Sequence, residues 1–155
     1  MAKHEAISRS VLFLGLSDQD KERIAQVAEE LEFADGELIC RQGEEGDALF
    51  LIDEGCVEVV INAEEEDEVV LATLSSEAGE GSDYAGDFFG EMSLIDIEPR
   101  SASVRSRGSA RVVRISALKF METFSNDLGA QLTVITNIAR VLSRRLRETT
   151  QKWCA

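Results

Sequence analysis

The stretch FFGEMSLIDIEPRSASV, residues 88–104, decides the fold and the function that we expect for this chain. Gly90 allows a sharp turn, and Met92–Ile95 can then form a short helical turn whose first amides point outward, unpaired and partly positive. Such amides bind anions, most often phosphates. Pro99 stiffens the return of the chain, and Arg100 follows with a planar guanidinium that can pair with two phosphate oxygens. The stretch therefore predicts a phosphate site.

Glu91 lies in the same stretch, nine residues before Arg100. A carboxylate would repel a phosphate, but beside an anion site it can accept a hydrogen bond from a sugar hydroxyl, as the acidic residue of dinucleotide-binding folds does. The pair therefore indicates a ligand that carries both a phosphate and a sugar. The alternative interpretation is a surface turn in which this glutamate and this arginine have no joint role.

The segments Gly90–Leu94 and Pro99–Val104 resemble the phosphate-binding cassette of the cyclic nucleotide-binding domain family. This family includes bacterial catabolite activators, cyclic-nucleotide-dependent kinases and cyclic-nucleotide-gated channels. The resemblance implies that the glutamate holds the ribose 2′-hydroxyl and that the arginine pairs with the cyclic phosphate. It also implies that amides around Met92 and Ser93 and the hydroxyl of Ser101 contact the phosphate. The residues expected at the site are Gly90, Glu91, Met92, Ser93, Arg100 and Ser101.

Residues 36–52 and 54–59 resemble the same family, in which glycines turn the chain between the strands of a β-roll. Gln42 stands where many members have glutamate, a change that we expect to be harmless. We interpret Gly43 and Gly46 as structural glycines and not as a phosphate loop, because no Gly-Lys followed by Ser or Thr comes after them.

Short β-rich runs broken by glycines fill residues 32–115, a pattern typical of a sandwich, barrel or jelly roll. Residues 5–31 and 116–150 have helical spacing of apolar residues. We therefore expect one domain over residues 1–155, of the α+β class and mainly β. An antiparallel β-roll (double-stranded β-helix) would lie between N-terminal helices and C-terminal hinge and lid helices. Predicted strands are 38–41, 49–52, 57–61, 69–74, 103–107 and 111–115, and predicted helix N-caps are Ser17, Ser116 and Asn126 or Asp127.

Two apolar stripes run along the C-terminal helix. One has heptad spacing and suits a partner helix, and the other suits packing on the β-roll. We expect a homodimer through the heptad stripe; alternatively, both stripes pack within one monomer. The resemblance implies that this helix covers the bound base as a lid, with Trp153 as a candidate cap. The heptad stripe is Leu128, Leu132, Ile135, Ala139, Leu142 and Leu146, and the second stripe is Val134, Ile138 and Val141.

The formal net charge of −14 is unevenly distributed. Residues 1–99 hold 27 acidic residues against five Lys or Arg, whereas residues 100–155 hold three against eleven. The acidic front half would repel a nucleic acid backbone, so we expect no nucleic acid partner. We expect Glu64–Glu68 to form a solvated hairpin tip and Glu77–Gly86, which includes Tyr84, to form a mobile loop near the site.

Composition also bears on the location of the protein. The sequence has no run of eighteen apolar residues, and its start lacks the apolar segment of a secretory signal, so we expect neither a membrane span nor secretion. The three cysteines, Cys40, Cys56 and Cys154, are odd in number and far apart, which favours reduced thiols. A cytoplasmic protein is the expectation. The single histidine, His4, is expected to be exposed to solvent.

These features favour a cyclic nucleotide sensor, with cyclic AMP favoured over cyclic GMP by family resemblance. Because the chain stops at Ala155 without a helix-turn-helix segment, we expect its signal to pass through an effector protein that the sequence does not identify, unless the chain is a fragment of a larger protein. The alternative is a degenerate β-roll that acts as a dimeric scaffold without binding nucleotide. We expect no enzyme activity and no metal, because one histidine cannot supply the ligands of a metal-dependent jelly roll.

Overall fold

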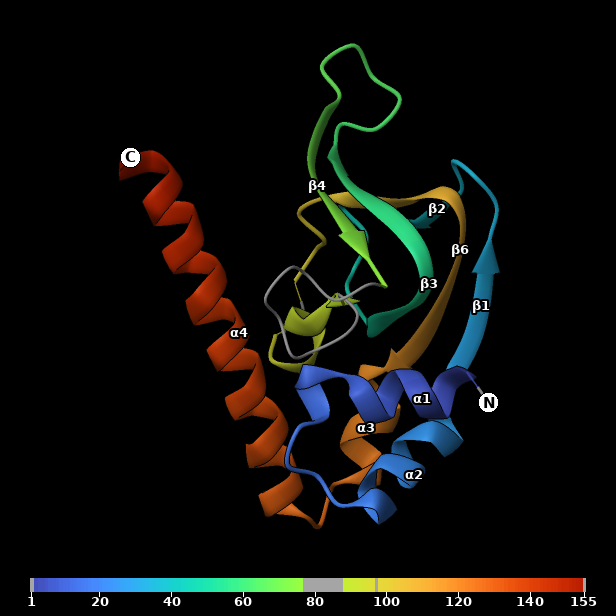
Figure 1. Ribbon diagram of the computed structural model, residues 1–155, viewed down its shortest axis with the longest axis vertical. Coiled ribbons are helices and arrows are strands. Elements are labelled where there is room, and N and C mark those ends of the chain that lie inside the picture. The colour runs from blue at the N-terminus through green and yellow to red at the C-terminus, as the bar shows by residue number, and fades with distance from the viewer. Residues whose placement is uncertain (1, 77–87, 97, 155) are drawn as a thin grey trace.

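A computed structural model describes residues 2–76, 88–96 and 98–154 of the chain. The helices are α1 (Ala2–Arg9), η1 (Val11–Phe13), α2 (Asp18–Val27), η2 (Glu91–Leu94), α3 (Ala117–Thr123) and α4 (Leu128–Cys154). The strands are β1 (Glu29–Phe33), β2 (Leu38–Cys40), β3 (Ala48–Ile61), β4 (Val69–Ser75), β5 (Phe88–Phe89) and β6 (Ser103–Ser116). Helices α1, α2 and α3 gather at one end of the strands, and α4 runs obliquely along one side (Figure 1).

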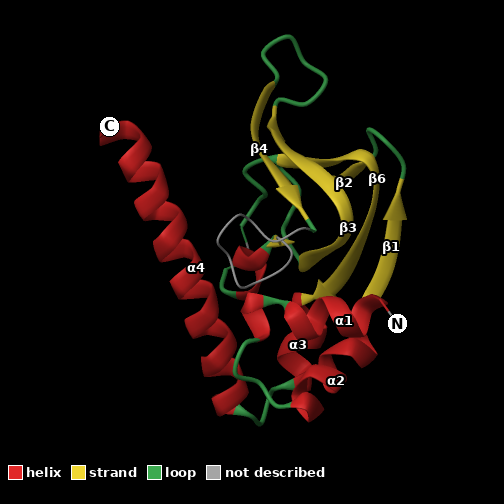
Figure 2. Ribbon diagram, in the orientation of Figure 1, coloured by secondary structure: helices red, strands yellow, loops and turns green. Residues whose placement is uncertain are grey.

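The described strands form one antiparallel sheet in the order β1-β6-β3-β4, with β2 paired to β6 and β5 paired to β3. The sheet curves around itself into a β-roll (Figure 2), which confirms the predicted class and architecture. The two 14-residue strands, β3 and β6, pair along most of their length and form its frame.

Strands β3 and β6 each join two runs that we predicted as separate strands. The pairing shifts register between Ile52 and Cys56 and so bends the sheet without ending a strand. Gly55 lies in this bend with a φ of +92°, and a Cβ there would collide with the Ser109 carbonyl oxygen. Glycine therefore marks a kink within a strand here, where the sequence alone indicated a turn between strands.

Both faces of β3 are buried at its start, which gives the protein two cores. Phe50 and Ile52 point into the roll with Val57, Phe89 and other apolar residues. Leu49 and Leu51 point the other way, into a core shared with the helices. Because side chains alternate across a strand, the same segment holds the roll together and attaches the helices to it.

The predicted boundary between the N-terminal helices and the roll was wrong. We expected helix to residue 31, but α2 ends at Val27 and Glu29–Phe33 is strand β1. Leu31 and Phe33 alternate with glutamates and pair with Val112 and Ala110 of β6. The alternation is a strand signal that the helical spacing of the preceding residues concealed.

The predicted helix N-caps are confirmed. The Ser17 hydroxyl accepts a hydrogen bond from the Asp20 amide, and the Ser116 hydroxyl accepts one from the Lys119 amide. Asp127 caps α4 through the Ala130 amide. Helix α4 runs to Cys154 and so passes the expected end at residue 150.

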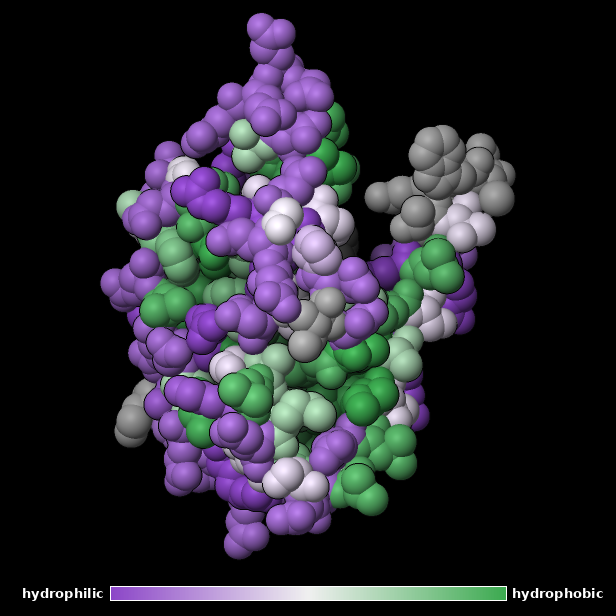
Figure 3. Space-filling view, turned by 180° about the vertical axis from the view of Figure 1, so that it is seen from behind, coloured by the Kyte–Doolittle hydropathy of each residue, from purple (hydrophilic) through white to green (hydrophobic). Residues whose placement is uncertain are grey.

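The two stripes of α4 have different surroundings. Val134, Ile138 and Val141 are buried in the core shared with the N-terminal helices and the roll. Most of the heptad stripe is exposed, and apolar side chains follow α4 along one face of the molecule (Figure 3). Leu142 is the exception, because it is half-buried against the core.

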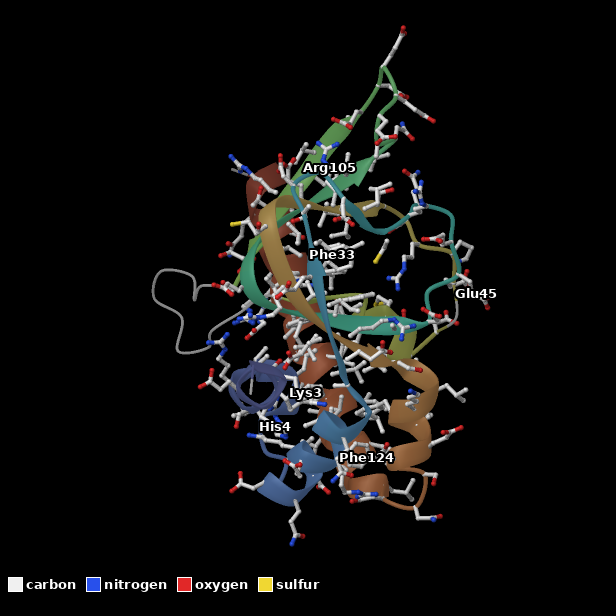
Figure 4. All side chains as sticks on the ribbon, turned by 90° about the vertical axis from the view of Figure 1, so that its right-hand side faces the viewer. Lys3, His4, Phe33, Glu45, Arg105 and Phe124 are labelled. Carbon is white, nitrogen blue, oxygen red and sulfur yellow. The ribbon has the colours of Figure 1, made fainter. Side chains whose placement is uncertain are left out.

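The acidic hairpin between β3 and β4 is only partly solvated. Glu68 is half-buried and pairs with Arg105 of β6 at 2.7 Å, and Glu58 of β3 lies 3.4 Å from the same arginine. Arg105 thus anchors the base of the hairpin (Figure 4), which corrects the expectation that all five acidic residues are solvated. The hydrogen bond from Arg105 holds the pKa of Glu68 below its ordinary value.

Several expectations concern other parts of the chain. The segment Glu77–Gly86 with Tyr84 and the side chains of Trp153 and Cys154 lie outside the described residues.

His4 is less exposed than expected, since its Nε2 lies 3.1 Å from Glu22 in α2. Within residues 2–76, 88–96 and 98–154, no helix is long and apolar enough to cross a bilayer, and no cluster of three His, Cys, Asp or Glu side chains could hold a metal.

Candidate functional site

All six residues predicted for the site line one cavity of about 570 Å³. The cavity lies between the segment 88–104, strands β3 and β4, and helix α4. Its volume is in the usual range for pockets that bind small molecules. The described lining residues are Val59, Ala72, Leu74, Phe88, Phe89, Gly90, Glu91, Met92, Ser93, Glu98, Pro99, Arg100, Ser101, Ala102, Val104 and Arg145.

Gly90 makes the turn that opens the site. Its φ of +79° is in the left-handed region, and it directly precedes helix η2. A Cβ at this position would lie 2.5 Å from the Ala48 carbonyl oxygen and 3.2 Å from an Arg100 nitrogen. The position therefore requires glycine both for its backbone conformation and for space.

Helix η2 forms where a short helical turn was predicted, as a 3₁₀ turn. The Ser93 amide, however, donates a hydrogen bond to the Gly90 carbonyl oxygen at 3.0 Å. This departs from the expectation of an unpaired amide, because a 3₁₀ turn closes its hydrogen bonds after three residues instead of four. The Ser93 side chain is buried, while Met92 is about half exposed at the rim.

Arg100 is held by backbone groups of a neighbouring loop. Its amide donates to the Glu44 carbonyl oxygen at 2.7 Å, its own carbonyl accepts from the Gly43 amide at 2.8 Å, and Glu45 and Pro99 form a β-bridge. A Cβ on Gly46 would lie only 2.8 Å from the Ser93 hydroxyl oxygen. Gly43 and Gly46 therefore have structural roles, as the sequence predicted.

The Arg100 guanidinium donates to the Ala48 carbonyl oxygen at 3.2 Å and lies 5.7 Å from the centre of the Phe50 ring. Among the described residues, no carboxylate lies within ion-pair distance of it. A half-buried cation that lines a cavity and contacts only neutral groups is available for an anionic ligand. Ser101 follows it on the exposed side of the same cavity.

Glu91 has a partner that the sequence analysis missed. Its side chain is only 7% exposed, and its Oε1 accepts a hydrogen bond from Arg145 Nη1 of α4 at 2.7 Å. The same guanidinium lies over the Phe88 ring, 4.8 Å from its centre. One signal was available, since this arginine comes four residues after Val141 and so shares the inward face of α4.

The remaining wall of the cavity is apolar. Val59 of β3, Ala72 and Leu74 of β4, and Val104 of β6 contribute to its lining. Sequence reasoning placed these residues on strands but missed their part in the site, because an alternating pattern does not identify which face lines a cavity. The site thus combines a cation, a buried carboxylate and an apolar wall. It can accommodate a ligand that has an anionic group, a hydroxyl and a flat apolar part.

Comparison with known proteins agrees with this geometry. Residues 30–127 match the family model described as the cyclic nucleotide-binding domain. This match covers more than half of the chain, so the chain belongs to the cyclic nucleotide-binding domain family. The cassette resemblance and the β-roll prediction are thereby confirmed at the level of the family.

Two curated relatives are cAMP-dependent protein kinase regulatory subunits. The subunit of Mycosarcoma maydis is 32% identical over 139 residues, which cover 89% of this chain and 23% of the relative. The subunit of Blastocladiella emersonii is 28% identical over 118 residues, which cover 76% and 27%. The chain therefore spans about a quarter of the length of these relatives.

Among solved structures, the catabolite activator protein of Thermus thermophilus is similar to this chain. Its TM-score is 0.72 and its sequence identity is 28%, and the match covers 93% of this chain and 62% of that one. The similar proteins thus include kinase regulatory subunits and a catabolite activator, and this chain covers only part of the length of each.

Proposed function

We propose that this domain binds a cyclic purine nucleotide in the 570 Å³ cavity and signals occupancy by a change in conformation. The observation that carries the proposal is the environment of Arg100, a cavity-lining guanidinium with no carboxylate partner among the described residues. A cyclic phosphate would provide the missing countercharge. Ser101, the turn at Gly90 and helix η2 lie around the same point and would complete the phosphate contacts.

Glu91 would accept a hydrogen bond from the ribose 2′-hydroxyl. Its carboxylate is buried in the same cavity as Arg100, and a buried carboxylate favours a polar partner strongly. The purine would then lie against the apolar wall formed by Val59, Ala72 and Leu74. We propose cyclic AMP over cyclic GMP, because the two curated relatives are named as cAMP-dependent subunits.

We propose a regulatory and not a catalytic role, with an effector protein as the recipient of the signal. A ligand can shift the conformation only if it binds two conformations with different affinity. Helix α4 is suited to report such a change, because it contacts the cavity through Arg145 and presents exposed apolar residues along its length. We further propose that these residues form a homodimer contact and that the protein functions in the cytoplasm with reduced thiols.

Calorimetric titration of the nucleotide-stripped protein tests the ligand. Cyclic AMP, cyclic GMP and 5′-AMP should be titrated separately, and we expect micromolar or tighter binding of a cyclic nucleotide with 5′-AMP ignored. Tighter binding of cyclic GMP would correct the base preference only. Failure of both cyclic nucleotides to bind would contradict the proposal and support a dimeric scaffold instead.

A further inference from the structure

We propose that Glu98 is a specificity-determining residue: its charge lets the cavity accept a phosphate diester with one negative charge and disfavours phosphate monoesters, which carry nearly two. The disfavoured ligands are nucleoside monophosphates and polyphosphates. The inference rests on the proposed function, because it concerns the same cavity. It starts from two residues of opposite charge, Glu98 and Arg100, which both line this cavity and stand two positions apart in the chain.

The backbone between these two residues is paired with a neighbouring loop. The Gly46 amide donates a hydrogen bond to the Glu98 carbonyl oxygen at 3.2 Å. The Arg100 amide donates to the Glu44 carbonyl oxygen at 2.7 Å, and Pro99 forms an antiparallel bridge between these two bonds. In a paired, extended segment, side chains two positions apart point to the same side and start about 7 Å apart. Glu98 and Arg100 are therefore expected on the same side, which agrees with their place in the lining of one cavity.

The charges of the described lining residues are two carboxylates and two guanidiniums. Glu91 pairs with Arg145 at 2.7 Å, so these two charges offset each other. Glu98 is exposed, Arg100 is half-buried, and neither lies within ion-pair distance of an opposite charge among the described residues. One negative charge on a ligand would neutralise Arg100. A second negative charge would find the other described guanidinium already paired and would be repelled by Glu98.

The charge of the ligand sets the size of this repulsion. A cyclic phosphate is a diester with a single ionised oxygen, whereas a phosphate monoester carries a charge of about −1.5 to −2 at pH 7. A unit charge roughly 7–10 Å from an exposed carboxylate, with water between them, changes affinity by about a factor of three. Glu98 therefore weakens binding of a diester about threefold and binding of a monoester about ninefold, so it favours the diester by their ratio.

The test compares E98Q with E98D, which keeps the charge, and with E66Q, which removes an equal charge at the exposed hairpin between β3 and β4. Titration followed by NMR chemical shifts also measures weak binding, and its ligands would be cyclic AMP, 5′-AMP and adenosine 5′-methyl phosphate. The last is an acyclic diester with one charge, so it separates charge from ring closure.

E98Q should bind the two diesters about threefold more tightly and 5′-AMP about ninefold more tightly than the natural protein does. E98D and E66Q should bind all three ligands like the natural protein. An equal gain for all three ligands in E98Q, no gain, or a comparable gain in E66Q would overturn the proposal.

Salt separates an electrostatic role of Glu98 from a change in the shape of the site. The ninefold gain of E98Q for 5′-AMP should fall below about twofold when NaCl is raised from about 0.05 M to about 1 M, because screening removes the repulsion. A gain that persists at high salt would overturn the charge mechanism.

This proposal and the proposed function fail in different ways. If cyclic AMP binds but E98Q gains nothing for 5′-AMP, the cyclic nucleotide function stands and the role of Glu98 is refuted. If cyclic AMP does not bind, but 5′-AMP and the methyl ester bind and differ in their gain in E98Q, the role of Glu98 stands and the cyclic nucleotide function is refuted. Failure of all three ligands to bind the natural protein and E98Q would overturn both.

Discussion

The Arg100 guanidinium donates a hydrogen bond to the Ala48 carbonyl oxygen at 3.2 Å. The same oxygen would lie 2.5 Å from a Cβ on residue 90, so one backbone group of β3 binds the arginine and also excludes a side chain at the glycine turn. The cation and the turn that precedes helix η2 thus lie beside the same carbonyl group in the absence of ligand. A preorganised site of this kind loses little entropy on binding, and each of its parts can be tested separately.

Replacing Arg100 with Ala should weaken binding of cyclic AMP about a hundredfold or more, because a buried phosphate would lose its countercharge. Titration calorimetry would measure the loss, and circular dichroism would check the fold. Arg107 is exposed on β6, the strand that follows Arg100, so R107A serves as the control and should bind normally. Affinity of the natural protein in R100A would exclude a phosphate role for this arginine.

Replacing Gly90 with Ala should lower both stability and affinity. The left-handed φ alone costs about 1 kcal/mol, and the close contact with the Ala48 carbonyl oxygen adds further strain of about 1–3 kcal/mol. Gly36 has a nearly equal φ of +81° but open space around it, so G36A isolates the backbone cost. Urea unfolding would compare the two variants. Equal destabilisation would mean that the neighbouring carbonyl relaxes without penalty.

The Glu68–Arg105 pair should make the stability of the hairpin sensitive to acid. The hydrogen bond from Arg105 lowers the pKa of Glu68 in the folded state. The stabilisation is therefore present above the ordinary carboxyl pKa of about 4.3 and is lost as the pH falls through the lower, folded value. The urea midpoint of E68Q should fall less with acidification than that of the natural protein. E66Q, at an exposed position of the same hairpin, should behave like the natural protein; identical acid profiles in all three would contradict the assignment.

Charging the exposed stripe of α4 should separate a dimer if this stripe forms it. Leu132 and Ile135 are 66% and 46% exposed, so L132E/I135E should fold normally and give a monomeric mass by light scattering. Leu142 is unsuitable for this test because it packs against the core. R140E changes the net charge equally at an exposed position outside the stripe and should leave the dimer intact. A dimer that survives the double change would place the contact elsewhere.

Patterns of residues close together in the sequence were sufficient to predict the glycine turn, the helix caps and the two stripes of α4. Gly90 and Arg100 were identified because a turn glycine and an arginine after proline act within a few residues of chain. Ser17 and Ser116 were identified as helix caps for the same reason, since a cap bonds to an amide three residues away. The buried and exposed stripes of α4 followed from helical periodicity alone.

Other features depended on contacts between distant parts of the chain. Strand β1 was missed because its alternating pattern is short and follows a helical one, and its pairing with β6, which joins Leu31 to Val112, stabilises the strand. The use of the Ser93 amide within helix η2 depended on which helical turn the backbone adopted, a choice that the residue types leave open.

The sequence by itself predicted the family and the β-roll, and it predicted six site residues that all line one cavity. The six residues could be predicted because they lie in one short stretch, residues 88–104. Only the tertiary structure decided that Arg145, 54 positions from Glu91, closes that site. Four arginines lie within eight residues of α4, and helical spacing places Arg145 on the same face as Val141 but does not show that it meets a carboxylate. That choice follows from the angle at which α4 crosses the roll, which packing of Val134 and Ile138 sets far from the arginine itself.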